Sequence, residues 1–221
     1  MAFDLYIFDL DGTLIDTRQD ITTAVNEILH HYNLESKSVD EVTDYVGDGI
    51  RKLVQRCIEQ SSIEQSSIVN SRVSLDEAVS MFKDSYWSHM HDTTITYPGI
   101  TELLTHLKDK KKAILTNKAY KFTKAIMDRL GLTKQFSLIV GGDTVSKKKP
   151  STEGIEFILQ ETGKPRDRTV MIGDGKNDIL VAKKAGLISV YVTYGFTSIE
   201  RLDGIKPDYI IDTPLELMEI G

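Results

Sequence analysis

The sequence is poor in cysteine, in long hydrophobic runs and in positive charge, and each shortage excludes a class of protein. Cys57 is the only cysteine among 221 residues, which excludes an intrachain disulfide and a multi-cysteine zinc site. No apolar run approaches the roughly 18 residues that a membrane-spanning helix needs. The 27 lysine and arginine residues are outnumbered by 33 aspartate and glutamate residues. The net charge of −6 argues against sequence-independent binding of nucleic acid, which depends on cations that neutralise phosphates.

The first residues and the overall composition indicate where such a chain functions. Residues 1–4 lack the basic segment followed by an apolar stretch that is typical of a secretory signal. Hydrophobic residues make up 40% of the chain and charged residues 27%, which is typical of a globular protein. We expect a cytoplasmic protein without nucleic-acid or membrane partners, whose oligomeric state the sequence leaves open.

Short apolar segments rich in β-branched or aromatic residues predict buried strands. Helical patterns lie between the later strands, and this alternation predicts an α/β fold with a Rossmann-like, mostly parallel sheet. The predicted strands are residues 5–8, 113–115, 136–140, 169–172, 189–192 and 209–211. The predicted helices are residues 100–108, 118–130, 152–162, 177–185 and 214–220.

The first predicted strand is separated from the second by about a hundred residues, which is too long for an unstructured loop inside a compact domain. Apolar residues in this stretch recur at helical spacing, for example at Ile21, Val25 and Ile28. We therefore predict a helical cap domain of residues 16–92, inserted into an α/β core of residues 1–15 and 93–221.

Acidic residues directly follow two of the predicted strands. Asp9 and Asp11 come after the first strand, and Asp174 and Asp178 come after strand 169–172. Because ligands bind beyond the carboxyl ends of parallel strands, we expect these four carboxylates to converge there. Carboxylates that lie this close together raise one another's pKa values unless a cation compensates their charge. Oxygen ligands of this kind favour Mg²⁺, so the sequence predicts a magnesium site.

Groups that bind anions follow the same strands. Gly12 permits a close approach of the backbone, with free N–H donors. Thr116 and Asn117 offer side-chain donors, and Lys149 offers a positive charge next to a proline. Lys118 either joins this set or is exposed in the first turn of a helix. A metal ion, an ammonium group and several donors around one point suit a phosphoryl group, whose transfer is accelerated by positioning and charge neutralisation.

The two-residue spacing of Asp9 and Asp11 is the most specific of these features. In an extended segment, side chains at this spacing point the same way. One carboxylate can then attack phosphorus while the other handles a proton. The attack produces an aspartyl-phosphate, which divides one difficult hydrolysis into two easier steps.

Taken in order, these residues resemble the four motifs of the haloacid dehalogenase-like hydrolase superfamily. The segments that carry the resemblance are Asp9-Leu10-Asp11-Gly12-Thr13, Thr116, Lys149-Pro150, and Gly173-Asp174 through Asp178. The resemblance implies that Asp9 is the nucleophile and Asp11 the general acid/base. It implies that Thr116 binds phosphate and that Lys149 steadies the nucleophile and the phosphoryl group.

The same resemblance implies a set of metal ligands. Asp174 would bind Mg²⁺, Asp178 would support the metal or the lysine, and the metal would also take the carboxylate of Asp9. The backbone carbonyl of Asp11 would be a further ligand.

Within the superfamily, the sequence is similar to the phosphoglycolate phosphatase group. The similar features are the helical insert, Val46-Gly47-Asp48-Gly49, Tyr97-Pro98-Gly99, Leu115-Thr116-Asn117-Lys118 and Gly141-Gly142-Asp143. Thr152 and Gly175 depart from the group, which often has proline and a hydroxyl residue at these positions. The resemblance implies a Mg²⁺-dependent phosphatase of a small phosphorylated metabolite, with 2-phosphoglycolate as the first candidate. The alternatives are a phosphomutase of the β-phosphoglucomutase type, a pyrophosphatase and an inactive regulatory binding protein on the same fold.

One glycine-rich segment in the predicted cap domain has two interpretations. Gly47-Asp48-Gly49 predicts a turn between two helices. If this turn closes over the site, Gly49 and Arg51 bind the substrate, with Arg51 or Lys52 meeting a substrate carboxylate. The alternative is a solvated start of a helix.

Overall fold

The computed structural model describes residues 3–65 and 74–220, and the chain divides into two compact units. One unit, here called the α/β unit, consists of Met1–Asp16 and Ile95–Gly221. The other, the helical unit, is Thr17–Thr94. The chain leaves the α/β unit after β2 (Ile15–Asp16) and re-enters it at β3 (Ile95–Thr96), and these two strands pair antiparallel. This two-stranded sheet was not predicted from the sequence.

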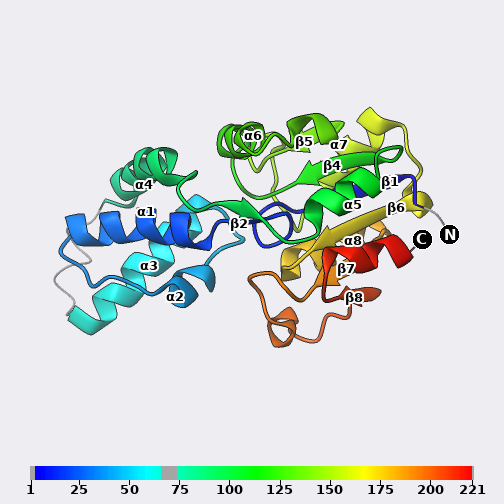
Figure 1. The fold of residues 1–221 in the computed structure, drawn as a ribbon. Coiled ribbons are helices and arrows are strands. Elements are labelled where there is room, and N and C mark those ends of the chain that lie inside the picture. The colour runs from blue at the N-terminus through cyan, green and yellow to red at the C-terminus, as the bar shows by residue number, and fades with distance from the viewer. Residues whose placement is uncertain (1–2, 66–73, 221) are drawn as a thin grey trace. The chain divides into compact units, whose positions relative to one another are not determined.

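A six-stranded sheet forms the centre of the α/β unit (Figure 1). Its strand order is β5-β4-β1-β6-β7-β8, and each neighbouring pair is parallel. The strands are β1 (Leu5–Phe8), β4 (Lys111–Leu115), β5 (Leu138–Val140), β6 (Thr169–Gly173), β7 (Ile188–Val192) and β8 (Tyr209–Ile211). The predicted α/β fold with a parallel sheet and a helical insertion is therefore confirmed.

The helices of the α/β unit lie between these strands in sequence. They are α5 (Ile100–His106), α6 (Tyr120–Arg129), α7 (Glu153–Thr162) and α8 (Lys176–Ala185). The short 3-10 helices are η1 (Thr133–Gln135), η2 (Arg166–Arg168), η3 (Ile199–Leu202) and η4 (Pro214–Glu219). The helix predicted over 214–220 is present as η4, which has the tighter 3-10 geometry that is usual for short helical segments.

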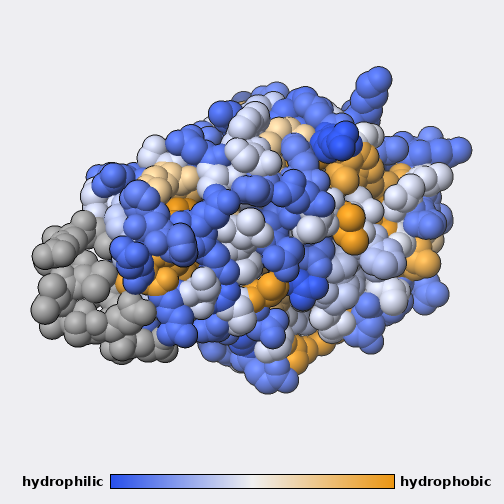
Figure 2. Space-filling view, turned by 60° about the vertical axis from the view of Figure 1, so that its left-hand side comes forward, coloured by the Kyte–Doolittle hydropathy of each residue, from blue (hydrophilic) through white to orange (hydrophobic). Residues whose placement is uncertain are grey.

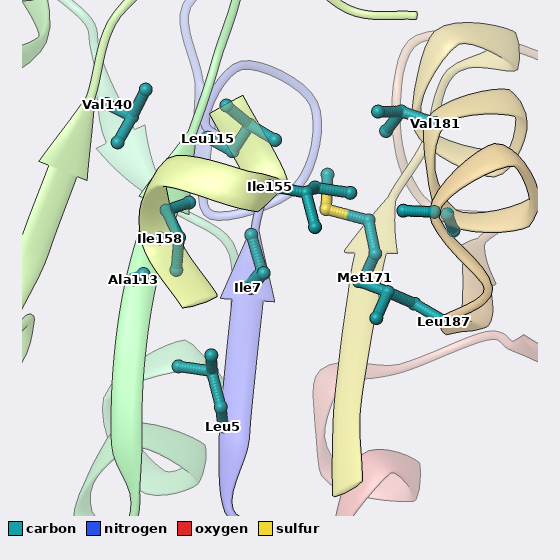
Figure 3. Packing of buried hydrophobic residues seen from close by; sticks show 12 residues of the cluster. Leu5, Ile7, Ala113, Leu115, Val140, Ile155, Ile158, Met171, Val181 and Leu187 are labelled. Atoms are coloured by element: carbon teal, nitrogen blue, oxygen red, sulfur yellow. The ribbon is translucent and has the colours of Figure 1, made fainter. Parts of the chain in front are cut away.

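Alternating side chains of β1 pack on opposite faces of the sheet. Leu5 and Ile7 are fully buried in a cluster with residues of α7 and α8, as Figure 3 shows for Ile155 and Val181. Phe8 points to the other face, since successive side chains of a strand alternate, and its ring packs edge-on against Phe136. Both faces of β1 are thus buried, which fixes the strand whose end carries Asp9.

The helical unit contains α1 (Arg18–His31), α2 (Val39–Thr43), α3 (Ile50–Gln65) and α4 (Leu75–His89). Apolar side chains at helical spacing are buried between α1 and α4, including Ile21, Val25 and Phe82. Asp20 of α1 is also buried and accepts hydrogen bonds from the backbone N–H groups and hydroxyls of Thr93 and Thr94. These bonds fix the end of the helical unit against its first helix.

Hydrophobic side chains on the face shown in Figure 2 form small patches among hydrophilic residues. Trp87, Ile95 and Ile210 are among the large apolar side chains that are exposed. Among the described residues, no helix is both long enough and apolar enough to span a membrane.

Candidate active site

The predicted site residues follow four neighbouring strands at their carboxyl ends. Asp9 follows β1, Thr116 follows β4 and Asp174 follows β6 directly, whereas Lys149 lies in the longer connection after β5. Because β5, β4, β1 and β6 are adjacent in the sheet, their ends bring these residues to one edge. Asp178 reaches the same place from the first turn of α8.

Three carboxylates meet at this edge. Asp9, Asp174 and Asp178 each offer an oxygen, and these oxygens lie within 4.8 Å of one another. The ammonium group of Lys149 lies among them, 2.8 Å from Asp9 Oδ1 and 2.5 Å from Asp178 Oδ1. The side chains of Lys149 and Asp178 are almost completely buried, with 3% and 2% exposure. This cluster brings together residues of different motifs that are up to 169 positions apart in the sequence.

The charge of the cluster is not balanced by its own residues. Burial, and to a smaller extent the negative charge of Asp178, raise the pKa of Asp9 to about 7. Burial and the charges of Asp9 and Asp178 raise the pKa of Asp174 to about 8. For Lys149, burial lowers the pKa, but the two adjacent carboxylates outweigh it and the pKa lies above its usual range. With all groups ionised, three carboxylates face one ammonium group and leave two negative charges.

These residues fit a divalent cation. Carboxylate oxygens are the ligands that Mg²⁺ prefers, and one such ion neutralises the two excess charges. Asp9 Oδ1 is buried, and it lies close to Lys149 without a directed hydrogen bond from any described group. The donor set therefore suits Mg²⁺ held by Asp9, Asp174 and Asp178.

Asp11 lies outside this carboxylate cluster. Both of its carboxylate oxygens accept hydrogen bonds from Lys118 Nζ, at 2.9 Å each. The two side chains are 11% and 7% exposed, so the pair is mostly shielded from water. The interpretation of Lys118 as an exposed residue of a first helical turn was wrong, because α6 begins only at Tyr120. The ion pair with Lys118 therefore fixes the carboxylate of Asp11, which is not part of the cluster of Asp9, Asp174 and Asp178.

Thr116 and Asn117 are buried in the turn after β4, as their position at the strand end predicts. The Thr116 hydroxyl oxygen accepts a hydrogen bond from the backbone N–H of Lys118, at 3.2 Å. The side-chain amide of Asn117 binds the backbone of Lys149. Its Oδ1 accepts from the backbone N–H of Lys149 at 2.9 Å, and its Nδ2 donates to the carbonyl oxygen of Lys149 at 3.1 Å. Asn117 therefore holds the backbone of the residue that carries the ammonium group.

The two carboxylate oxygens of Asp178 bind different groups. Its Oδ2 accepts a hydrogen bond from the backbone N–H of Gly175 at 2.9 Å, at the start of α8. Its Oδ1 pairs with Lys149. The same side chain therefore both stabilises a helix start and fixes the lysine.

Gly12 lies in the turn after β1 with a φ of 82°, and a Cβ atom there would lie 2.3 Å from Asp174 Oδ2. This approach is possible only for glycine. The neighbouring Thr13, fully buried, donates from its hydroxyl to Asp174 Oδ1 at 3.2 Å. The backbone N–H of Phe196 donates to Asp174 Oδ2 at 2.8 Å. Phe196 was not predicted from the sequence, although its position just after the predicted strand 189–192 was a usable signal.

Gly49 and Arg51, the predicted substrate-binding residues of the insertion, lie in the helical unit. Gly49 has a φ of 93° and directly precedes α3. The exposed side chain of Arg51 forms an ion pair with Asp76.

Comparison with known proteins places this arrangement in a family. The sequence profile described as haloacid dehalogenase-like hydrolase matches residues 6–192, a range that contains every site residue discussed above except Phe196. The chain belongs to the haloacid dehalogenase-like hydrolase family. The resemblance of its sequence to this superfamily is confirmed.

Relatives within this family are similar over almost the whole chain. The phosphoglycolate phosphatase of Vibrio parahaemolyticus is 33% identical and is aligned over 98% of this chain and 95% of its own length. That of Aquifex aeolicus is also 33% identical, over 97% of this chain and 94% of its own length. A crystal structure from Haemophilus somnus, described as a predicted phosphoglycolate phosphatase, superimposes with a TM-score of 0.88 at 27% identity. It covers 99% of this chain and 97% of its own. The chain is thus a hydrolase of this family that resembles phosphoglycolate phosphatases.

Proposed function

We propose that this hydrolase is a Mg²⁺-dependent phosphatase of a small phosphate monoester, with 2-phosphoglycolate as the first candidate substrate. The observation that carries the proposal is the cluster of Asp9, Asp174 and Asp178 around Lys149 at the carboxyl edge of the sheet. The relatives named phosphoglycolate phosphatase support the choice of substrate.

In the proposed reaction, Asp9 is the nucleophile. A carboxylate oxygen of Asp9 attacks phosphorus, the bond from phosphorus to the ester oxygen breaks, and an aspartyl-phosphate forms. The ammonium group of Lys149, 2.8 Å from Asp9 Oδ1, orients the nucleophile and offsets negative charge on the transferring phosphoryl group. When bound, Mg²⁺ supplies positive charge that neutralises the phosphoryl oxygens and the carboxylates that hold it.

Asp11 carries the proton in both steps of this proposal. It gives a proton to the departing ester oxygen, and in the second step it takes one from the water that attacks the aspartyl-phosphate. The bond between Asp9 and phosphorus then breaks and releases inorganic phosphate. Lys118 holds both carboxylate oxygens of Asp11 and thereby fixes the position of this group. The hydroxyl of Thr116 and the backbone at Gly12 are the proposed donors to the phosphate.

A substrate panel tests the proposal. Phosphate release is measured from 2-phosphoglycolate, other small phosphate esters, a hexose phosphate and pyrophosphate, each with Mg²⁺ and with EDTA. We expect turnover of a monoester that EDTA abolishes. We expect Asp9→Asn to lower kcat by roughly 10⁴-fold or more, with an unchanged circular dichroism spectrum.

The same panel separates the alternatives. Formation of an isomeric hexose phosphate would indicate a phosphomutase, and exclusive cleavage of pyrophosphate would indicate a pyrophosphatase. If no compound were turned over and the protein did not bind Mg²⁺, a regulatory binding protein would replace the proposed enzyme.

A further inference from the structure

The segment Thr193–Phe196, which follows β7, lies beside the active site, although no role was predicted for it from the sequence. β7 pairs with β6, and Asp174 follows the end of β6. The segment therefore leaves the sheet next to the strand that carries Asp174. Three of its consecutive residues contact either Asp174 or the turn after β1, as described below.

The carboxylate of Asp174 receives one hydrogen bond on each oxygen. The backbone N–H of Phe196 donates to Oδ2 at 2.8 Å, and the hydroxyl of Thr13 donates to Oδ1 at 3.2 Å. A rotation of the carboxylate would break at least one of these bonds. Because each carboxylate oxygen accepts about two hydrogen bonds or ligands, both oxygens retain capacity for a cation.

Gly195 brings the backbone of the segment against the Asp174 side chain. A Cβ atom at Gly195 would lie 2.2 Å from Asp174 Cβ and 2.5 Å from the carbonyl oxygen of Gly12. Gly12 approaches the same side chain from the turn after β1. Asp174 is therefore held closely between the backbones of two glycines.

Tyr194 ties the segment to the turn after β1. Its hydroxyl donates to the carbonyl oxygen of Thr13 at 3.1 Å, and its ring packs against Tyr97 with the ring centroids 4.9 Å apart. Burial raises the pKa of Tyr194 well above its usual range, so the hydroxyl stays protonated and remains a donor. The same turn that supplies Thr13 to Asp174 is thus fixed by the segment.

We propose that Thr193–Phe196 is a positioning element of the active site, which holds the carboxylate of Asp174 in the orientation that binds the divalent cation. The inference rests on the proposed function in one respect, that Asp174 is a ligand of Mg²⁺. Groups that orient metal ligands typically contribute 10- to 100-fold to metal affinity. The segment acts through Asp174 and contacts no reacting atom.

The direct test is the Mg²⁺ affinity of Gly195→Ala, measured by isothermal titration of the purified full chain with MgCl₂ alone. We expect the dissociation constant to rise by about 10- to 100-fold, because the new methyl group displaces Asp174 or the Phe196 N–H. Gly204→Ala is the matched control. Gly204 also has an unusual backbone conformation, with a φ of 78°, but a Cβ atom there would meet no other atom within 4 Å. We expect this control to lose some thermal stability and to keep the wild-type affinity for Mg²⁺.

A second pair of variants tests the hydrogen bond from the opposite side of Asp174. Thr13→Val keeps the shape of the side chain and removes the donor, and we expect weaker Mg²⁺ binding. Thr13→Ser keeps the hydroxyl, and we expect it to restore most of the affinity. If Gly195→Ala and Thr13→Val lost only thermal stability and bound Mg²⁺ like the wild type, the segment would be merely structural and the inference would be overturned.

Failure of the proposed function and failure of this inference give different results. A wild-type protein that binds Mg²⁺ but hydrolyses no phosphate compound contradicts the proposed function, while the affinities of the variants still decide the inference. A wild-type protein that binds no Mg²⁺ overturns both.

Discussion

Lys149 shows how closely the site depends on single residues. It is the last of three consecutive lysines, and only it is buried, whereas Lys147 and Lys148 are exposed. Asn117 binds both backbone polar groups of Lys149 and so fixes where its side chain begins. The position before Pro150 correctly indicated which lysine reaches the carboxylates. The use of Asn117 was not predictable, because its partner lies 32 residues away in sequence.

Replacement of Lys149 by methionine should affect both activity and stability. It leaves Asp9 and Asp178 buried without their common partner, and loss of one member of a buried ion pair typically costs about 3–5 kcal/mol. We expect Lys149→Met to lower the free energy of unfolding by an amount in that range, measured by urea denaturation at neutral pH. We also expect kcat to fall by roughly 10²–10³-fold, because a preorganised positive charge is lost.

Lys147→Met is the control for this experiment. Its side chain is exposed, so we expect its free energy of unfolding to change by less than about 0.5 kcal/mol. Equal effects of the two substitutions would contradict the proposed role of Lys149.

The raised pKa values of Asp9 and Asp174 predict how the stability of the metal-free protein depends on pH. Between the ordinary carboxyl pKa and the raised values of about 7 and about 8, the folded state binds protons that the unfolded state has released. The slope of the free energy of unfolding against pH is proportional to the number of protons bound in the unfolded state minus the number bound in the folded state. This difference is negative here, so the free energy of unfolding falls as pH rises. We expect Tm in EDTA to fall between about pH 5 and about pH 9.

Added Mg²⁺ should oppose this decrease, since the ion binds the deprotonated carboxylates. We expect the rise in Tm on addition of Mg²⁺ to be larger at the alkaline end of the range. Asp174→Asn removes one of the titrating groups and should flatten the profile in EDTA. A Tm in EDTA that rises across this range in the wild type would contradict the charge imbalance of the cluster.

At the scale of elements, the bounds of two strands were predicted to the residue, whereas the start of one helix was not. β1 and β8 have the predicted bounds, because their buried apolar residues form short continuous runs. The helix predicted over 118–130 begins two residues later in the structure, at Tyr120. The backbone N–H of Tyr120 donates to the carboxylate of Asp143 at 2.7 Å. Asp143 belongs to another strand connection. Helical periodicity is a local property and cannot reveal a helix start that a distant side chain determines.

The junction of α1 with the end of the helical unit provides a stability test at this scale. Asp20 is buried and accepts hydrogen bonds from Thr93 and Thr94 on both oxygens, at 2.5 to 3.0 Å. Asp20→Asn replaces one of the two accepting carboxylate oxygens by an NH₂ group, which would face the N–H and hydroxyl donors of Thr93 or Thr94. We expect this to lower the free energy of unfolding by about 2 kcal/mol, measured by urea denaturation followed by circular dichroism.

Asp76→Asn serves as the matched control for Asp20→Asn. Asp76 is exposed and forms a surface ion pair with Arg51, so we expect its substitution to change the free energy of unfolding far less than Asp20→Asn does. If Asp20→Asn were equally mild, the contacts of Asp20 would contribute little to the stability of the helical unit.

At the scale of the whole molecule, the chain divides into two compact units, each of which buries hydrophobic residues. In the α/β unit, one cluster of buried hydrophobic residues lies between the sheet and the helices α7 and α8. The helical unit buries the residues between α1, α3 and α4, among them Cys57. The clustered active-site carboxylates lie in the α/β unit, whereas Cys57 lies in the helical unit. Catalytic activity therefore reports on the α/β unit, and the reactivity of the Cys57 thiol reports on the helical unit.

Cys57 is therefore a probe of opening in the helical unit. Its thiol is 1% exposed, and burial raises its pKa to about 12. We expect negligible reaction with a thiol reagent in native buffer and one equivalent in denaturant, since the reactive species is the exposed thiolate. Rapid labelling of the native protein, with undiminished activity, would show that the helical unit opens while the α/β unit stays folded.

The sequence by itself determined the α/β fold class, most of the strands and the identities of the acidic and basic residues at the strand ends. These features are readable because side-chain periodicity and residue type are local properties of the chain. The tertiary structure decided which of these groups meet. It pairs Asp11 with Lys118, gathers Asp9, Asp174 and Asp178 into one cluster, and brings Phe196 to Asp174. The reason is that strand order in the sheet differs from strand order in the sequence, so contacts between strand ends depend on the folded chain as a whole.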